Sequence, residues 1–213
     1  MCLIFIRDAR KSETIDWYHL ERAHTANRDG FGCAIFTGGR WERATSLRTS
    51  WGEVRATIET LEDMGGPYAV HFRYTTKGRT MKSNCHPFGI GRGQWLMHNG
   101  TITRQARISI RDGWSDSREV ASRLRDREWE INRLHEIAVD GLNRFAVSHP
   151  TGKIEAIGDW HEFKGGLYSK PTYSLRETKR RARRSIRSVA RRGRDTSRST
   201  PWYTQERFDF HVY

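Results

Sequence analysis

Apolar residues recur along the chain at two spacings, one of two residues and one of three to four residues. The first spacing and short apolar runs predict strands over residues 3–6, 33–36, 41–46, 68–74, 93–97, 144–148, 153–158 and 166–169. The second spacing predicts helices over residues 13–24, after Ser50, after residues 115–117 and around residues 131–138. Strands come first, helices interrupt them and strands return, an order that favours an α+β fold with helices packed on antiparallel sheets.

Local signals indicate where some of these elements begin and end. Ser50 and Glu53 have the spacing of a capping box, and the following helix carries Val54, Ile58 and Leu61 on one face. The Gly65-Gly66-Pro67 sequence ends that helix. Residues 27–32 predict a turn, because Gly30 and Gly32 would supply backbone freedom there.

Composition narrows the class of protein. The chain has 213 residues, of which 36% are hydrophobic, and its 8 Trp, 7 Tyr and 9 Phe can fill one domain core. Its apolar runs fall short of the roughly 20 residues of a membrane span, and its start lacks the layout of a secretory signal. The 3 cysteines form no CxxC pair, so they indicate neither a disulfide framework nor a cysteine zinc site. We therefore expect a protein of the reducing cytoplasm, without membrane contact.

The net charge of +13 is unevenly distributed. Residues 176–200 hold eleven basic and two acidic residues, so this segment carries most of the excess. We therefore predict two parts: a folded domain over residues 1–175 and a basic, flexible C-terminal segment over residues 176–213. A segment of this charge, from Arg176 to Thr200, is suited to contact nucleic acid or an acidic partner.

Cys2 follows Met1 directly, and an apolar strand follows Cys2. The cysteine side chain is small enough for methionine to be removed, which would leave a thiol beside a free α-amine. Such a residue is a nucleophile with its own base, since the amine has a pKa of roughly 7.7–8.0. The alternative is that Cys2 is only a small core residue.

Three polar clusters follow or precede predicted strands, at residues 71–78, 84–88 and 98–102. Asn99-Gly100 has two interpretations, as a hairpin turn or as an amide and a backbone N–H that face a developing oxyanion. Arg73 is either a solvated charge or the anchor of a carboxylate substrate. Three histidines in these clusters, His71, His86 and His98, do not have zinc-site spacing, and we expect no metal site.

Together with Cys2, these clusters resemble the glutaminase domain of class II glutamine amidotransferases, which are N-terminal-nucleophile hydrolases. The matching motifs fall in the family's order: Met1-Cys2, Asn27-x-Asp29-Gly30-x-Gly32, His71-x-Arg73-x-x-Thr76-x-Gly78, Asn84-x-His86-Pro87-Phe88, His98-Asn99-Gly100-x-Ile102 and Ser115-Asp116-Ser117. The resemblance covers roughly residues 2 to 170. It implies a four-layer αββα sandwich and a stand-alone, cytoplasmic type of glutaminase.

The resemblance also implies roles for individual residues. Cys2 would attack the side-chain amide of glutamine, and Asn99 with the Gly100 N–H would form the oxyanion hole. Arg73 and Asp116 would bind the α-carboxylate and α-ammonium of glutamine. Thr76 and Gly78 would line the pocket. The reaction would pass through a thioester to glutamate and ammonia, with no cofactor and no metal.

The sequence departs from the family at Tyr74, where a Trp is frequent, and at Lys77, where a His is frequent. No synthase domain follows residue 170 in this sequence, so the ammonia acceptor would be a separate synthetase or ligase. Two alternatives stay open. One is an N-terminal-nucleophile amidohydrolase of another amide, and the other is a catalytically degenerate scaffold that acts as a basic nucleic-acid-binding protein.

Overall fold

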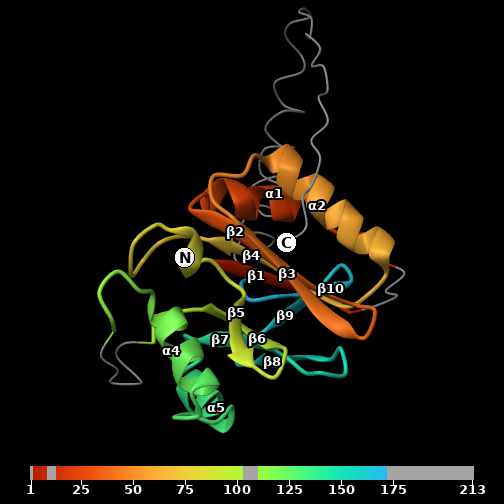
Figure 1. Ribbon diagram of the computed structural model, residues 1–213. Coiled ribbons are helices and arrows are strands. Elements are labelled where there is room, and N and C mark those ends of the chain that lie inside the picture. The colour runs from red at the N-terminus through yellow and green to blue at the C-terminus, as the bar shows by residue number, and fades with distance from the viewer. Residues whose placement is uncertain (1, 9–12, 103–109, 172–213) are drawn as a thin grey trace, which may run out of the picture. The chain divides into compact units, whose positions relative to one another are not determined.

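The computed structural model describes residues 2–8, 13–102 and 110–171, and their strands form two antiparallel sheets (Figure 1). The first sheet has the order β3-β2-β4-β1-β10-β9, so the strand nearest Cys2 lies inside the sheet. The bounds of its strands are β1 Leu3–Arg7, β2 Gly30–Thr37, β3 Arg40–Ser46, β4 Tyr68–Arg73, β9 His161–Phe163 and β10 Gly166–Tyr168. Leu3 pairs with Phe72, and Phe5 pairs with both Val70 and Tyr168.

The second sheet has the order β5-β6-β7-β8. Its strands are β5 Phe88–Gly91, β6 Gln94–Asn99, β7 Arg144–Ser148 and β8 Ile154–Ile157. The pairs β5–β6 and β7–β8 are hairpins, whereas β6 and β7 are joined through the segment that contains the helices α4 and α5.

Among the described residues the helices are α1 Trp17–Ala26, α2 Trp51–Met64, α4 Asp116–Arg125 and α5 Asn132–Ala138, with a 3-10 turn, η1, over Lys82–Asn84. The predicted capping box is confirmed: Ser50 and Glu53 cap α2 reciprocally, and Gly65 ends it in the left-handed conformation. Helix α1 starts later than residue 13, because the Asp16 side chain accepts a hydrogen bond from His19 N and caps the helix there.

Three hydrophobic clusters separate four layers. On β1, Leu3 and Phe5 pack toward α1 and α2, whereas Ile4 and Ile6 pack against the second sheet. The far face of the second sheet packs on α4 and α5 through a third cluster that includes Val120. The layers are therefore helices, sheet, sheet and helices, which confirms the expected αββα sandwich (Figure 1).

The predicted turn over residues 27–32 is wrong, because Gly30 and Gly32 lie in β2 rather than in a turn. Close packing explains these glycines. A Cβ at Gly30 would lie 2.6 Å from Cys85 Sγ, and one at Gly32 would lie 1.7 Å from the His86 carbonyl oxygen. Glycine lets the segment at residues 85–86 approach the backbone of β2.

Two short strands, β5 and β9, were not expected from the sequence. Among the residues that the structure describes, none of the helices combines the length and the apolar composition needed to span a bilayer. The basic segment over residues 176–213 lies outside the described residues, as does Met1.

Candidate active site

Cys2 immediately precedes β1, and its thiol lies against the backbone just after β4. Tyr74 N donates to Cys2 Sγ over 3.3 Å, and the thiol can donate in turn to Tyr74 O, also over 3.3 Å. The antiparallel register of Leu3 with Phe72 produces this contact, since it brings the residue before Leu3 beside those after Phe72. Only the backbone of Tyr74 takes part, so the departure from the family's Trp does not alter these two contacts.

Burial and the neighbouring groups act in opposite directions on the pKa of the Cys2 thiol. Burial raises the pKa of the Cys2 thiol above its ordinary value, while the hydrogen bond from the Tyr74 backbone and the charges of Arg73 and Lys170 lower that pKa. Lys170 responds to the same neighbour: burial lowers the pKa of its ammonium, and Cys2 raises it. The thiol therefore has cationic neighbours that would stabilise its thiolate form.

Arg73 ends β4, opposite Gly30 of β2, and its residue is only 3% exposed. One guanidinium nitrogen, Nη2, donates to the carbonyl oxygen of Arg79 over 3.2 Å. The other, Nη1, is buried without a hydrogen-bond partner among the described residues. A buried guanidinium N–H without a partner is costly, so this atom is suited to receive an anionic group.

Asn99 ends β6 in the second sheet, and its side chain reaches the first sheet. Its Nδ2 donates to Ser169 Oγ over 2.9 Å and, more weakly, to Ser169 O over 3.5 Å. Ser169 is in turn fixed to β1, because its Oγ accepts Ile4 N over 2.8 Å and its own N donates to Ile4 O over 3.0 Å. Asn99 is therefore held beside the start of the strand that Cys2 precedes.

Gly100 does not form a hairpin turn, because β6 pairs with β7 and not with a strand that follows at once. Its φ is +155°, and a Cβ there would lie 2.3 Å from Asn143 Oδ1 and 2.8 Å from His98 Nε2. Both neighbours are buried, so the position accepts only glycine. The hairpin interpretation of Asn99-Gly100 is therefore wrong.

Asp116 lies in the first turn of α4, after the N-cap Ser115, and is 4% exposed. Its Oδ2 accepts Ile102 N over 2.9 Å, and its Oδ1 accepts Ser117 N over 2.9 Å. The carboxylate therefore fixes the segment that follows Gly100 to the start of α4. Oδ1 also accepts the Ser117 hydroxyl over 3.4 Å, so Oδ2 is the oxygen with a lone pair that these hydrogen bonds do not use.

Thr76 and Gly78 belong to the loop after β4, and both are exposed. Gly78 has a φ of +74°, and a Cβ there would lie 2.5 Å from the Trp114 carbonyl oxygen. This loop is tied to the segment before α4 by Asn84. Its Nδ2 donates to the carbonyl oxygens of Arg79 and Gly113 over 2.8 and 2.7 Å, and its Oδ1 accepts Ser115 N over 3.1 Å.

The three histidines of the motifs are buried between these elements. His98 is held through both ring nitrogens, with Ser117 Oγ at 2.8 Å and Asn143 Oδ1 at 3.0 Å. The rings of His71 and His86 lie 4.0 Å apart, and burial lowers the pKa of both, that of His71 to about 3. Within the described ranges no group of three or more His, Cys, Asp or Glu residues could hold a metal ion.

The structure thus brings Cys2 next to Arg73 and links Asn99 to β1 through Ser169. Asp116 contacts the segment after Gly100. Within the described part of the chain, the Thr76 side chain makes no hydrogen bond. Sequence reasoning gave no role to Ser169 or Asn84. In the sequence, Ser169 is marked only by its place at the end of the last predicted strand, and Asn84 only by its place as the first residue of a motif. In the structure both side chains are buried.

Comparison with known proteins identifies the fold. No protein-family model and no curated protein matches the chain. Among solved structures, glutamine phosphoribosylpyrophosphate amidotransferase from B. subtilis, complexed with ADP and GMP, superposes with a TM-score of 0.52 at 18% identity, over 81% of this chain and 42% of that chain. A structure described as the allosteric regulatory enzyme of purine biosynthesis gives a TM-score of 0.51 at 18% identity, over 79% and 41% of the two chains.

A glutamine aminotransferase class-II domain protein from Silicibacter pomeroyi gives a TM-score of 0.40 at 16% identity, over 78% of this chain and 87% of that one. This chain spans less than half of the two structures named first, that is, 42% and 41% of their lengths. The order of layers and the two antiparallel sheets agree with the superpositions of TM-score 0.52 and 0.51. The chain has the N-terminal-nucleophile hydrolase fold of class II glutamine amidotransferases.

Proposed function

We propose that the chain is a glutaminase of the class II glutamine amidotransferase type, which hydrolyses the side-chain amide of glutamine. The observation that carries the proposal is the position of the Cys2 thiol on the backbone of Tyr74, directly after Arg73. The buried Arg73 guanidinium has an N–H without a hydrogen-bond partner among the described residues. A nucleophile beside a carboxylate anchor is what hydrolysis of a free amino acid's side chain requires.

In the proposed reaction the Cys2 thiolate attacks the side-chain carbonyl carbon of glutamine and forms a C–S bond. The carbonyl electron pair moves to oxygen and then returns as the C–N bond breaks. The nitrogen leaves as ammonia with the proton that the thiol gave up, carried by the α-amine of a mature chain that begins at Cys2. Water then cleaves the thioester to glutamate and restores the thiol, so glutamine and water yield glutamate and ammonia.

The oxyanion of each tetrahedral intermediate would be bound by Asn99 and the Gly100 N–H. One N–H of the Asn99 amide is committed to Ser169 Oγ at 2.9 Å. Nδ2 makes only a long contact of 3.5 Å with Ser169 O besides this bond, so its second N–H is weakly used and could be given to an oxyanion at little cost. A donor of this kind contributes roughly 2.7–4 kcal/mol to the stability of a transition state.

The remaining proposed site residues recognise the amino-acid end of glutamine. Arg73 binds the α-carboxylate, and Asp116 uses the remaining lone pair of Oδ2 to accept the α-ammonium. Thr76 and Gly78 line the pocket, and the contact of Gly78 with Trp114 supports this, because it holds the loop beside α4. The proposed chemistry uses no cofactor.

We further propose that a separate synthetase or ligase receives the ammonia. The basic segment from Arg176 to Thr200 would contact that partner or a nucleic acid. Cys2, Cys33 and Cys85 are all free thiols, which supports a reducing compartment such as the cytoplasm.

An electrophilic glutamine analogue tests the proposal. We expect it to label Cys2, detected by peptide mass spectrometry, and to abolish the release of glutamate and ammonia. Cys2→Ala should fold and be inactive. Cys85→Ala is the control: it retains Cys2 and should be labelled like the wild type. Labelling of Cys85 instead, or glutamine hydrolysis by Cys2→Ala, would overturn the assignment. Hydrolysis of another amide with glutamine untouched would favour an amidohydrolase of different specificity.

A further inference from the structure

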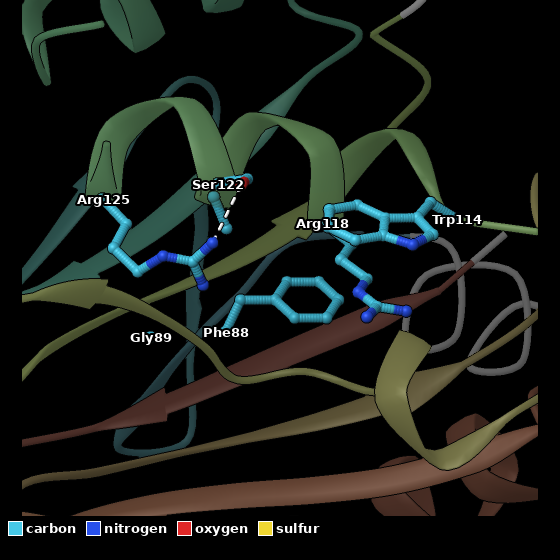
Figure 2. Close-up of a pocket in the computed structure, with 7 residues that line it drawn as sticks. Phe88, Gly89, Trp114, Arg118, Ser122 and Arg125 are labelled. Atoms are coloured by element: carbon cyan, nitrogen blue, oxygen red, sulfur yellow. Dashed lines mark hydrogen bonds between the residues drawn. The ribbon is translucent and has the colours of Figure 1, made fainter. Parts of the chain in front are cut away.

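A second concave site lies between α4 and β5, on residues that the proposed glutaminase site does not use (Figure 2). Its volume is about 220 Å³. Arg118, Ser122 and Arg125 line it from one face of α4, since their spacing of four and three residues places them on neighbouring turns. Phe88 and Gly89 of β5 line the other side, and Trp114 closes one end.

This cleft has an excess of positive charge. Arg118 donates to Ser83 Oγ over 3.0 Å and has no acidic partner among the described residues. Arg43, from β3, has none there either, and its Nη1 lies 2.9 Å from where a Cβ on Gly89 would be. Arg125 is paired with Asp126, and Arg111 lies 3.6 Å from the buried carboxylate of Glu119. Two of the four guanidinium groups around the cleft therefore lack a compensating carboxylate.

The positive charges of the neighbouring arginines also affect the pKa of Arg118. The pKa of Arg118 lies below its ordinary value, first because of burial and then because of the positive charges of Arg111 and Arg125. Ser122 Oγ gives Arg125 a fixed position by accepting its Nη2 over 2.9 Å. Like charges held this close are destabilising unless an anion lies between them.

Flat surfaces accompany the charges. The guanidinium carbons of Arg118 and Arg111 lie 3.9 and 4.5 Å from the centroid of the Trp114 ring, so both groups are stacked on it. Figure 2 shows the Phe88 ring between the side chains of Arg118 and Arg125. A stacked guanidinium keeps its edge free to donate to an anion while its plane covers an aromatic surface.

From this combination we propose that the cleft binds a nucleotide unit, with its phosphate on Arg125 and Arg43 and its base against Phe88 and the Arg118 guanidinium that stacks on Trp114. Arg118 and Arg125 are seven residues apart on α4, which separates them by about 10 Å along the helix axis. That length accommodates the base and phosphate of one nucleotide. An acidic peptide would use the charges but not the aromatic surfaces, so a nucleotide fits the whole cleft better.

The cleft and the proposed glutamine pocket share a wall. Gly78 packs on the backbone of Trp114, and Asn84 joins Arg79 to Gly113 and Ser115 through its side chain. Arg79 O in turn accepts Arg73 Nη2. The proposal does not rest on the glutaminase activity, since nucleotide binding can be measured without glutamine.

The test uses the full chain, with AMP as the probe. Binding is measured by nuclear magnetic resonance as a shift of the Trp114 indole N–H signal, and the Trp114→Phe variant assigns that signal. We expect AMP to shift the Trp114 signal. In the double variant Arg118→Gln, Arg125→Gln the dissociation constant should rise about tenfold, the result of losing one contact to the base and one charge contact to the phosphate. The single variant Arg43→Gln tests the opposite wall and should weaken binding several-fold.

The matched control is Arg40→Gln, Arg133→Gln, which removes two exposed arginines outside the cleft and should change the dissociation constant less than about twofold. A short single-stranded oligoadenylate, used as a second probe, distinguishes a free nucleotide from a nucleic-acid strand as the ligand. If AMP binding depends on the cleft arginines, a free nucleotide suffices; if only oligoadenylate binding does, the ligand is a strand. Equal weakening by the control, or no dependence of either probe on the cleft arginines, would overturn the proposal.

Discussion

Asn99 Nδ2 donates to Ser169 Oγ over 2.9 Å, and this hydrogen bond joins the second sheet to the first beside β1. The same oxygen accepts the buried Ile4 N–H over 2.8 Å. Ser169 therefore uses both lone pairs, one for a strand and one for the proposed oxyanion donor. Removing this hydroxyl should affect folding and the proposed reaction separately.

Ser169→Ala should lower the free energy of unfolding by about 1–3 kcal/mol, because Ile4 N–H would lose its acceptor. It should also lower the kcat of glutamine hydrolysis, since Asn99 would no longer be fixed. Ser148→Ala is a matched control: Ser148 Oγ accepts the backbone N–H of Trp95 in the second sheet over 2.7 Å. Chemical denaturation and ammonia release measure the two effects. Equal loss of kcat in both variants would show that Ser169 has only a structural role.

Arg73→Met should raise the KM for glutamine. Loss of a buried charge-assisted contact costs about 2–5 kcal/mol, and most of it should appear in KM because the contact is to a non-reacting carboxylate. Arg7→Met removes another buried arginine of the same sheet, one that is paired with Glu62, and should reduce stability without a specific change in KM. If a glutamine derivative lacking the α-carboxylate suffers the same loss, Arg73 does not bind that group.

The alkylation rate of Cys2 should increase with pH through a midpoint above the ordinary pKa of a thiol. The sign follows from burial, which raises the pKa of the Cys2 thiol, so that the reactive thiolate forms only at higher pH. Arg73→Met should move the midpoint further up, because a positive charge that favours the thiolate is lost. Mass spectrometry of the iodoacetamide product follows Cys2 separately from Cys33, whose pKa burial raises to about 11. A midpoint lowered by Arg73→Met would contradict this account.

Gly32→Ala should lower the free energy of unfolding by about 3 kcal/mol. The added Cβ would lie 1.7 Å from the backbone oxygen of His86, and a backbone atom cannot turn away as the end of a flexible side chain can. Gly52→Ala is the control, because the nearest atom to its added Cβ is 4.0 Å away in helix α2, and it should stabilise the protein by up to about 1 kcal/mol. Thermal and urea denaturation of the two variants give the comparison.

The sequence predicted the elements whose causes are local. The capping box of Ser50 and Glu53, the end of α2 at Gly65 and the apolar face of α2 all depend on residues a few positions apart. The two glycines of β2 were misread because their reason is a long-range contact with Cys85 and His86. Local sequence cannot show which distant backbone will approach a glycine.

The same distinction applies to the candidate site. Cys2 and Arg73 were predicted to belong to one site through a family resemblance, and the register of β1 with β4 gives the physical reason why Cys2 lies beside the end of β4. Their chemical roles stay predictions. Ser169 and the arginine cleft were not predicted, because each depends on side chains from separate elements. Arg43 comes from β3, Arg118 from α4 and Gly89 from β5, and nothing in the spacing of these residues announces that they meet.

The interior place of β1 has a consequence for biosynthesis. Among the described strands β1 leaves the ribosome first, and one of its edges can pair as soon as β4 has been made. Its other edge pairs with β10, which lies at the opposite end of the described chain, so it stays open through most of translation. An apolar strand with an unpaired edge is prone to associate with other chains. The strand beside the proposed nucleophile therefore keeps one edge unpaired until the last of the described strands, β10, has been made.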